Sequence, residues 1–433
     1  MNTERLAAFL DGGNVEVAPG GTAILPFFRR HVFALLMAFG LAVAPAAFAE
    51  EAPQRGEKLA SLPRIASEFQ RRIDALGMQD RIVIVMENEE AASSAATIHF
   101  RFHQAFTRHG LAFSPMPRVI DIKKKVAQQH PVGVNNVNLV RYPDGTLLPI
   151  RTILLTRHTF ADASATTQYL LQYPERPACE NPGVTIAAIH RAFAVHETFG
   201  HGTFGILHLN PDEMADEFYR RGMDEFRADL ASLIFAAHEE GNTSIGRFVA
   251  RHRIAGRFCK VKAAYGRLAA RAPGELFAAI DHPAPDFEER FLAPTEIYNN
   301  GENLLKAADE IDATLADPRK NQDFRRMDDK ALLALTDEMF HMLRPTPDAF
   351  RKQNRTLRAA AAFEAGRKKV REGRGNLDIG PHIRREPALA LNVRRFLGFV
   401  DASEDALLEP RAKWGPRRPS THRQHFSLPT FHL

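Results

Sequence analysis

The sequence predicts an α+β fold that is predominantly helical, with a large helical lobe and a smaller N-terminal α+β portion. Three observations support this prediction. Short apolar runs with the length of strands are confined to the part of the chain before residue 157. From there on, apolar residues recur at three- and four-residue steps, as they do on the buried face of a helix. A chain of 433 residues, with 45% hydrophobic and 25% charged residues, is long enough and apolar enough to bury a sizeable core.

Residues 1–49 have the pattern of an N-terminal extension followed by a secretory signal peptide. The basic residues 29–31 precede an apolar run over residues 32–44, and the small residues Ala47 and Ala49 follow it. A basic start, a short apolar stretch and an Ala-x-Ala end are typical of a cleaved signal. We expect cleavage after Ala49, rather than retention as a membrane anchor, because the apolar run is short for a membrane span. The sequence therefore predicts an exported protein, either periplasmic or secreted.

Residues 50–156 are predicted to form the α+β portion. The run RIVIVM has the length and composition of a strand, and apolar residues at helical spacing precede it. The sequence YPDG is a turn signal that predicts a hairpin between the strands on either side. The predicted helices cover residues 57–77 and 89–110. The predicted strands cover residues 81–86, 118–122, 136–141 and 147–156.

Residues 157–375 are predicted to form the helical lobe, and residues 376–433 a basic tail rich in proline. Asn181 and Pro182 suit the cap and first turn of the first long helix of this lobe. Beyond Gly373 prolines become frequent, and we expect this final stretch to be poorly ordered. The predicted helices of the lobe cover residues 184–202, 212–239, 244–271, 286–315, 328–343 and 346–371.

Charge and cysteine usage restrict the function classes without selecting one. The net charge of +5 comes largely from Arg and Lys in the C-terminal third, without the interleaved aromatic residues of a nucleic-acid-binding motif. A solvated basic face is therefore favoured over contact with nucleic acid, anionic lipid or acidic substrates. Cys179 and Cys259 form either one disulfide in an oxidising compartment or two buried thiols, and their spacing does not suit a metal site. The sequence gives no indication of the oligomeric state.

The most informative segment is the run HETFGH, in which His196 and His201 flank Glu197 on a predicted helix. Histidines four apart on a helix are separated by about 40° around the axis, so both can reach one metal ion. A separation of five residues corresponds to about 140° in a regular α-helix, which points the imidazoles away from each other. Both histidines can bind one ion only if the turn takes one extra residue, a π-bulge. Gly200 lies inside this turn, where its backbone freedom would ease the distortion.

A third ligand is expected on the next predicted helix. Catalytic zinc sites typically combine three protein ligands with an open position for water. The run DEFRAD supplies Asp224, Glu225 and Asp229. One of these carboxylates can ligate, and the others can accept the second N–H of the imidazoles. His208, seven residues after His201, is an alternative ligand, although a surface or capping histidine is the favoured interpretation.

The two motifs together resemble those of the dipeptidyl peptidase III family of zinc exopeptidases. Its hallmark is a His-Glu-x-x-Gly-His helix followed by a Glu-Glu-x-x-Ala-(Glu/Asp) helix, and this chain has HETFGH followed by DEFRAD. The resemblance covers about residues 185–235, and Asp224 stands where the family prefers Glu. It implies one zinc ion per chain, held by three ligands: His196, His201 and Glu225. It also implies that Glu197 activates water and that Asp224 and Asp229 are the partners of the histidines behind the metal.

These features predict zinc-dependent hydrolysis of peptide bonds, with short peptides as substrates. Glu197 is expected to act as general base, taking a proton from water and passing it to the leaving amine. Tyr219, His190 and His208 are unranked candidates for stabilising the oxyanion, and Arg227 is interpreted as a structural ion-pair residue rather than a substrate clamp. Two alternatives are a metallohydrolase of a non-peptide amide or ester, and a zinc-stabilised binding protein without catalysis. Glu197 favours hydrolysis, because a structural site needs no base.

Overall fold

The computed structural model describes most of the predicted helical lobe and part of the α+β portion. Every described residue belongs to one compact unit, Glu57–Leu433. The predicted signal peptide, and the predicted strand over residues 118–122, lie outside the described residues. The structure describes residues 59–61, 64–87, 90, 95–110, 136–141, 147–155, 158–160, 185–203, 217–281, 300–371 and 383–408.

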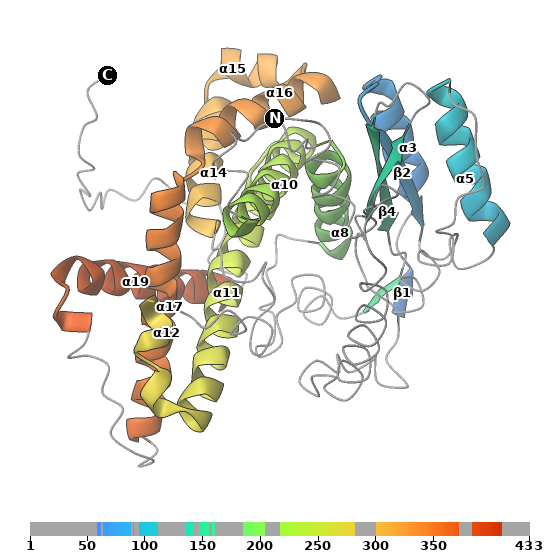
Figure 1. Cartoon of the computed structure of the whole chain (residues 1–433). Coiled ribbons are helices and arrows are strands. Elements are labelled where there is room, and N and C mark those ends of the chain that lie inside the picture. Colours follow the sequence, from blue (N-terminus) through green and yellow to red (C-terminus); the bar gives the residue numbers. More distant parts are fainter. Residues whose placement is uncertain are drawn as a thin grey trace, which may run out of the picture. The chain divides into compact units, whose positions relative to one another are not determined.

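The α+β portion contains a three-stranded sheet with β4 in the centre (Figure 1). β4 pairs in parallel with β2 and antiparallel with β3, while β1 and β5 form a separate antiparallel pair. β2 is buried along its whole length and contacts both helices of this portion, as its unbroken apolar run predicts. The elements are β1 (Leu59–Ser61), α3 (Ala66–Ala75), β2 (Ile82–Glu87), α5 (Ala95–Arg108), β3 (Asn136–Arg141), β4 (Leu147–Leu155) and β5 (His158–Phe160).

The first helix of this portion begins later than the sequence predicts. We expected a helix from residue 57, but β1 occupies residues 59–61 and α3 begins at Ala66. A side chain from the far end of β2 defines this start: Glu87 Oε1 accepts hydrogen bonds from the backbone N–H groups of Ile65 and Ala66, both at 3.1 Å. The first N–H groups of a helix have no partner within the helix, so a buried carboxylate at this position stabilises its N-terminus.

The rest of the described chain is helical, which confirms a predominantly helical α+β fold (Figure 1). α11 has the bounds predicted from the sequence, and α16 and α17 each begin one residue later than predicted. Among the described helices, none combines the length and the apolar character needed to cross a membrane. The elements are α8 (Ile186–Val195), η1 (His196–His201), α10 (Glu217–Glu240), α11 (Ser244–Arg271), η3 (Pro273–Glu275), α12 (Ala278–Asp281), α14 (Gly301–Ala316), α15 (Pro318–Arg325), α16 (Asp329–Leu343), α17 (Pro347–Arg371) and α19 (Pro387–Leu408).

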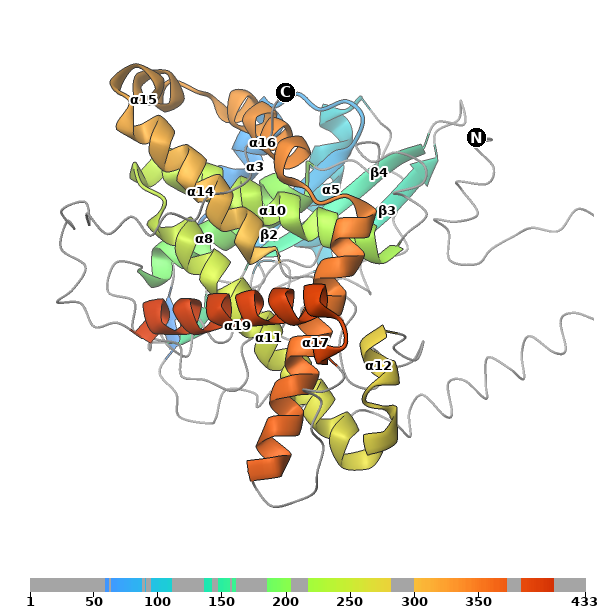
Figure 2. The same cartoon turned by 90° about the vertical axis from the view of Figure 1, so that its left-hand side faces the viewer.

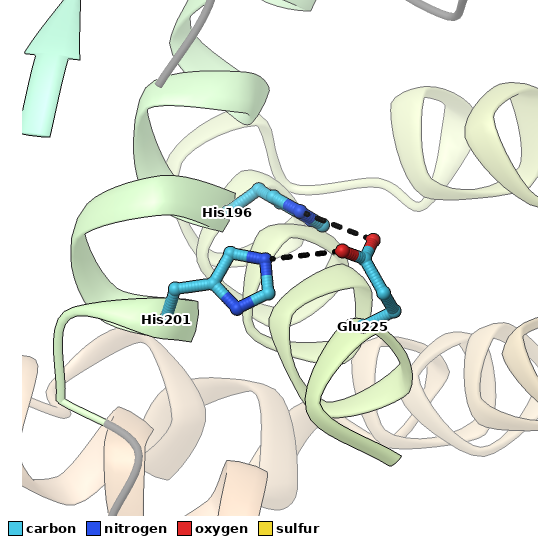
Figure 3. A group of neighbouring side chains, drawn as sticks. All are labelled: His196, His201 and Glu225. Carbon is cyan, nitrogen blue, oxygen red and sulfur yellow. Dashed lines mark ion pairs between the residues drawn. The ribbon is translucent and has the colours of Figure 1, made fainter. Parts of the chain in front are cut away.

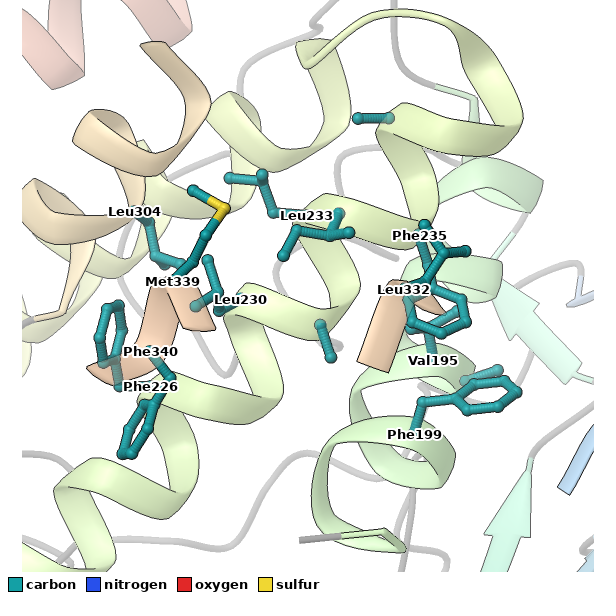
Figure 4. Packing of buried hydrophobic residues seen from close by; sticks show 14 of the residues in the cluster. Val195, Phe199, Phe226, Leu230, Leu233, Phe235, Leu304, Leu332, Met339 and Phe340 are labelled. Carbon is teal, nitrogen blue, oxygen red and sulfur yellow. The ribbon is translucent and has the colours of Figure 1, made fainter. Parts of the chain in front are cut away.

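The main hydrophobic core is shared by the α+β portion and the helical part. It joins buried side chains of α3, β2 and β4 to those of η1, α10, α14 and α16, and the helical side of this core is seen in Figure 4. Phe69 of α3, Phe199 of η1 and Phe235 of α10 meet in it, all of them fully buried. Burying a side chain of this size stabilises the folded state by about 1.5–3 kcal/mol. The run HETFGH is therefore built into the core, where η1 contacts α3, α8 and α10.

Two sequence predictions are wrong, one about the start of a helix and one about the order of the C-terminal stretch. Thr185, rather than Asn181, is the N-cap of α8: its hydroxyl accepts a hydrogen bond from the Ala188 N–H at 3.1 Å. Asn181 lies outside the described residues.

The stretch beyond Gly373 is not poorly ordered throughout, since it contains α19, which packs against α11 and α17 (Figure 2). Buried apolar side chains of these three helices and of α12 form a second hydrophobic cluster.

Candidate metal centre

The run HETFGH forms a single π-helical turn, as the five-residue spacing of its histidines requires. α8 leads directly into η1, which begins at His196 and ends at His201. The wider hydrogen-bonding step is seen where the Gly202 N–H donates to the Glu197 carbonyl, five residues earlier, at 2.9 Å. The two imidazole rings lie 4.8 Å apart between centroids, with their planes at 85°. A spacing that separates the rings in an α-helix thus brings them together here.

Glu225 of α10 completes a group of three metal-ligand side chains (Figure 3). Its Oε2 lies 3.7 Å from Nε2 of His196, and its Oε1 lies 3.5 Å from Nε2 of His201. One ligand atom from each of the three residues lies within 4.8 Å of the others. Two ligand atoms about 2.1 Å from a tetrahedral ion are separated by roughly 3.4 Å, which is close to these distances. His196, His201 and Glu225 therefore lie close enough together to bind a metal ion.

The other ring nitrogen of each histidine faces an aspartate on α10. Nδ1 of His201 lies 3.0 Å from Oδ2 of Asp224, and Nδ1 of His196 lies 2.9 Å from Oδ1 of Asp229. When Nδ1 carries the proton that such a carboxylate accepts, Nε2 keeps its lone pair for a metal ion. The structure thus brings both aspartates singled out in the sequence against the two histidines.

Asp229 is itself held by residues that the sequence did not single out. Arg253 of α11 donates two hydrogen bonds to its carboxylate, from Nε and Nη2, each at 2.9 Å. Asn300, at the start of α14, donates a third at 2.7 Å. Nη2 of Arg253 also lies 3.6 Å from Oε2 of Glu225. Three helices therefore orient His196 through Asp229, and no sequence motif connects Arg253 or Asn300 with the histidine run.

The charged groups of the site shift one another's pKa values. Burial favours the neutral form of Glu225, but the hydrogen bond and charge of His201 outweigh it and hold the pKa of Glu225 well below its usual value. Burial likewise opposes the charge of His201, yet the neighbouring Asp224 and Glu225 raise its pKa well above the ordinary value. The pKa of Asp229 is lowered, because Arg253 and His196 outweigh its desolvation. The carboxylates of Glu225 and Asp229 are therefore held ionised by neighbouring positive charges. A metal ion bound here would take the place of the proton on His201.

Glu197 differs from the other carboxylates of the site. Burial raises its pKa, and the nearby carboxylates Glu225 and Asp224 add to this effect, although His201 and His196 oppose it. Glu197 belongs to the same turn as both histidines, whereas Asp224 and Glu225 act on it from α10. It is not one of the three residues whose ligand atoms converge. The turn thus carries two metal-ligand side chains and, between them, a carboxylate with a raised proton affinity.

Gly200 is required in this turn for space. It is not one of the glycines with positive φ in the described chain, so its conformational freedom is not what the turn uses. A Cβ atom at this position would lie 2.5 Å from Cα and 2.6 Å from Cβ of Ala228 on α10. Neither atom of Ala228 belongs to a flexible side-chain end that could move away. The glycine therefore allows the turn to approach the helix that carries Glu225.

We expect Gly200→Ala to lower the free energy of unfolding by about 1–3 kcal/mol, the usual range for overpacking a dense core. Thermal unfolding measured by circular dichroism tests this expectation. Gly266→Ala is the matched control, since Gly266 lies within α11 and a Cβ there meets nothing within 4 Å. This control should be neutral or stabilising by up to about 1 kcal/mol, because alanine favours a helix more than glycine does. Equal melting temperatures for the two variants would contradict the packing argument.

Several other residues considered in the sequence have different surroundings. The Tyr219 hydroxyl is fully buried and donates a hydrogen bond to the Pro345 carbonyl at 2.7 Å, so it serves the fold. Arg227 forms an ion pair with Asp337 at 2.7 Å, which confirms its interpretation as a structural ion-pair residue. His190 is buried on α8, and Cys259 is buried on α11. His208 and Cys179 lie outside the described residues.

The described part of the chain thus contains a largely buried group of two histidines and one glutamate, set between two helices, that can bind a metal ion. This defines a candidate metalloprotein with an α+β fold. No family model, curated protein or solved structure matches the chain. The function is therefore argued from the residues of the site.

Proposed function

We propose that the protein is a zinc-dependent metallopeptidase that hydrolyses peptide bonds, with short peptides as substrates. The observation that carries this proposal is the convergence of His196, His201 and Glu225, with Glu197 in the same widened turn. Three ligands suit a catalytic site, because a fourth position is then left for water or substrate. A carboxylate beside the ligands, but not among them, suits the base that hydrolysis requires.

The donor set supports zinc as the metal. Two imidazole nitrogens and one carboxylate oxygen are a common ligand set of hydrolytic zinc sites. Two histidines and one carboxylate also serve iron(II) in oxygenases, so the donor set by itself does not separate these metals. Glu197 favours zinc, since a general base between the two histidines is typical of zinc-dependent hydrolysis. We infer one zinc ion per chain.

The side chains of the site have distinct roles in this proposal. A zinc ion held by the three ligands supplies Lewis-acid chemistry, polarising a carbonyl oxygen and lowering the pKa of water. Glu197 takes the proton from the attacking water and delivers it to the leaving amine. Its raised pKa suits this exchange, because a carboxylate with higher proton affinity is a better base. Asp224 and Asp229 hold the imidazoles in the tautomer and orientation that ligation needs.

Two features of the sequence support a peptide substrate and an exported protein. The motifs HETFGH and DEFRAD resemble those of the dipeptidyl peptidase III family, whose members are peptidases. The pattern of residues 29–49 is that of a secretory signal, so we propose a periplasmic or secreted location. Stable membrane anchoring and nucleic-acid binding are not part of the proposal.

Metal analysis combined with a peptide-cleavage assay tests the proposed function. We expect purified full-length protein to contain about one zinc per chain and to cleave members of a library of short peptides, detected by mass spectrometry. A chelator should abolish cleavage, and added zinc should restore it. Cleavage of non-peptide amides or esters alone would favour the other metallohydrolase, and a zinc-loaded protein inert toward all substrates would favour a binding protein. Stoichiometric iron, or no bound metal, would contradict the proposal.

A further inference from the structure

A buried arginine lies behind the metal-binding turn, on the same helix as Glu225. Arg227 of α10 is only 2% exposed. Its Nη1 donates hydrogen bonds to the backbone carbonyls of Phe199 and Gly200, at 3.2 and 2.9 Å, and lies 3.4 Å from Oγ1 of Thr203. These carbonyls belong to the two residues immediately before His201. One guanidinium group therefore contacts the part of the turn from which the second histidine projects.

The two carbonyls need such a donor because of their position. They lie in the last turn of η1, where the final carbonyls of a helix have no N–H partner within the helix. Both Phe199 and Gly200 are buried, so water is not an easy substitute. A buried carbonyl left without a hydrogen bond is unfavourable, and Nη1 of Arg227 carries two N–H groups with which it donates to both carbonyls. Thr203 contributes a further hydrogen bond, from its hydroxyl to the Phe199 carbonyl.

The guanidinium group is held from its other side by α16. Nε of Arg227 donates to Oδ1 of Asp337 at 2.7 Å. Asp337 is one-third exposed, whereas Arg227 is almost fully buried. A buried cation without a counter-charge is strongly unfavourable, so Asp337 both neutralises the arginine and fixes its direction. The contacts form a continuous series from α16, through α10, to the turn.

The same stretch of α10 also fixes the turn sterically. Ala228, the neighbour of Arg227, is the residue against which Gly200 packs without room for a Cβ atom. Glu225 precedes Arg227 by two residues on this helix. One packing contact and one set of hydrogen bonds, both from adjacent residues of α10, therefore constrain the position of the turn relative to Glu225.

We propose that Arg227 and Asp337 form a positioning pair for the metal centre. The pair sets the position of the widened turn relative to Glu225, and thereby the distance between the Nε2 atom of His201 and the Glu225 carboxylate. Arg227 acts through the backbone of the turn and is not itself a ligand. This inference rests on the metal centre of the proposed function, and it does not depend on whether the protein hydrolyses peptides.

The variant Asp337→Asn tests this role, with Asp281→Asn as a matched control. Asp281 of α12 pairs through Oδ1 with Nε of Arg355 at 2.5 Å and is 32% exposed, against 33% for Asp337. The Asp281 pair joins α12 to α17, two helices that carry residues of the second hydrophobic cluster and none of the three converging side chains. Each full-length variant is stripped of metal and titrated with Co²⁺, whose visible absorption reports the geometry of its ligands. Zn²⁺ affinity is then measured by competition with bound Co²⁺.

We expect Asp337→Asn to weaken Zn²⁺ and Co²⁺ binding by about 10–100-fold, the usual effect of changing a residue that supports a metal ligand. The Co²⁺ spectrum at saturation should also shift, since the turn is then placed differently. Asp281→Asn should change neither quantity, and Asp337→Glu should recover part of the affinity. A purely structural pair would change the melting temperature while leaving the spectrum of the saturated protein unaltered.

Three outcomes would overturn the inference. The first is wild-type affinity and an unchanged Co²⁺ spectrum in folded Asp337→Asn. The second is an equal loss of affinity in Asp281→Asn. The third is the failure of Asp337→Asn to fold, because the pair would then support the whole fold. If wild-type protein binds no Co²⁺ or Zn²⁺, the inference fails together with the proposed metal centre. If wild type binds metal but cleaves no peptide, only the proposed hydrolysis fails.

Discussion

Replacing Glu225 with alanine is expected to weaken metal binding by about 100-fold to several thousand-fold. Structural zinc sites contribute about 10–16 kcal/mol of binding free energy, and the loss of one ligand removes roughly a quarter to a third of it, about 3–5 kcal/mol. The carboxylate oxygens of Glu225 lie 3.7 Å from Nε2 of His196 and 3.5 Å from Nε2 of His201. Without them the imidazoles alone are left to hold the ion. Competition with a chromophoric chelator measures the affinity, and metal analysis measures the stoichiometry.

Glu239→Ala is a suitable control for this variant. Glu239 lies on the same helix and has nearly the same exposure as Glu225, 24% against 23%, but it pairs with Arg72 and Arg191 rather than with the histidines. Its removal should lower stability through the lost ion pairs and leave metal affinity at the wild-type value. If Glu225→Ala retained full metal affinity, the two histidines and Glu225 would not be the ligand set. His201→Ala should reproduce the loss.

Replacing Glu197 with glutamine is expected to reduce peptide hydrolysis by about 100- to 10,000-fold, the usual contribution of a general base. Glutamine has nearly the same shape but cannot accept a proton from water. Metal content should remain at the wild-type level, because Glu197 is not one of the converging ligands. The comparison requires turnover of a cleaved peptide and metal analysis on the same preparation.

The combination of the two measurements makes this prediction specific. Loss of metal in Glu197→Gln would show that the residue supports ligation, and its assignment as base would then be wrong. Unchanged turnover would exclude a catalytic role altogether. Glu197→Asp keeps a carboxylate on a shorter side chain and should retain more activity than the glutamine variant, with unchanged metal content.

The part of the site that sequence reasoning found is the part encoded locally. The five-residue spacing of His196 and His201 required a widened turn, and η1 spans this run. Spacing within one helix is sufficient for such an argument, because helical geometry fixes the angle between two side chains. The bounds of α11 were predictable for the same reason, since its apolar residues recur along a single uninterrupted element.

Contacts between distant elements were not predictable from one sequence. Arg253, Asn300 and Asp337 reach the site from three helices that follow α10 in the chain, and their roles depend on how these helices pack. The start of α3 depends in the same way on Glu87, which comes from the end of a strand twenty-one residues beyond Ala66. Local patterns carry no information about these partners.

Other errors came from residues with more than one structural meaning. The frequent prolines after Gly373 suggested disorder, yet Pro387 is the first residue of α19. Proline is well tolerated there, because the first N–H groups of a helix have no intrahelical partner. Gly200 was expected to supply backbone freedom, whereas the structure uses its lack of a side chain. In both cases the residue was noted, but its physical role depended on the tertiary structure.

The packing of Phe199 favours the widened turn independently of a bound ion. Its ring stacks on that of Phe235 with centroids 4.6 Å apart (Figure 4). The Arg72 guanidinium lies 4.9 Å from the centroid of the Phe199 ring. A regular α-helical turn would rotate this ring out of the stack or His201 away from Glu225, so apolar packing and ligation favour the same unusual turn. The core therefore holds the three side chains in place, and a metal ion that binds here would spend little of its binding free energy on reshaping the turn.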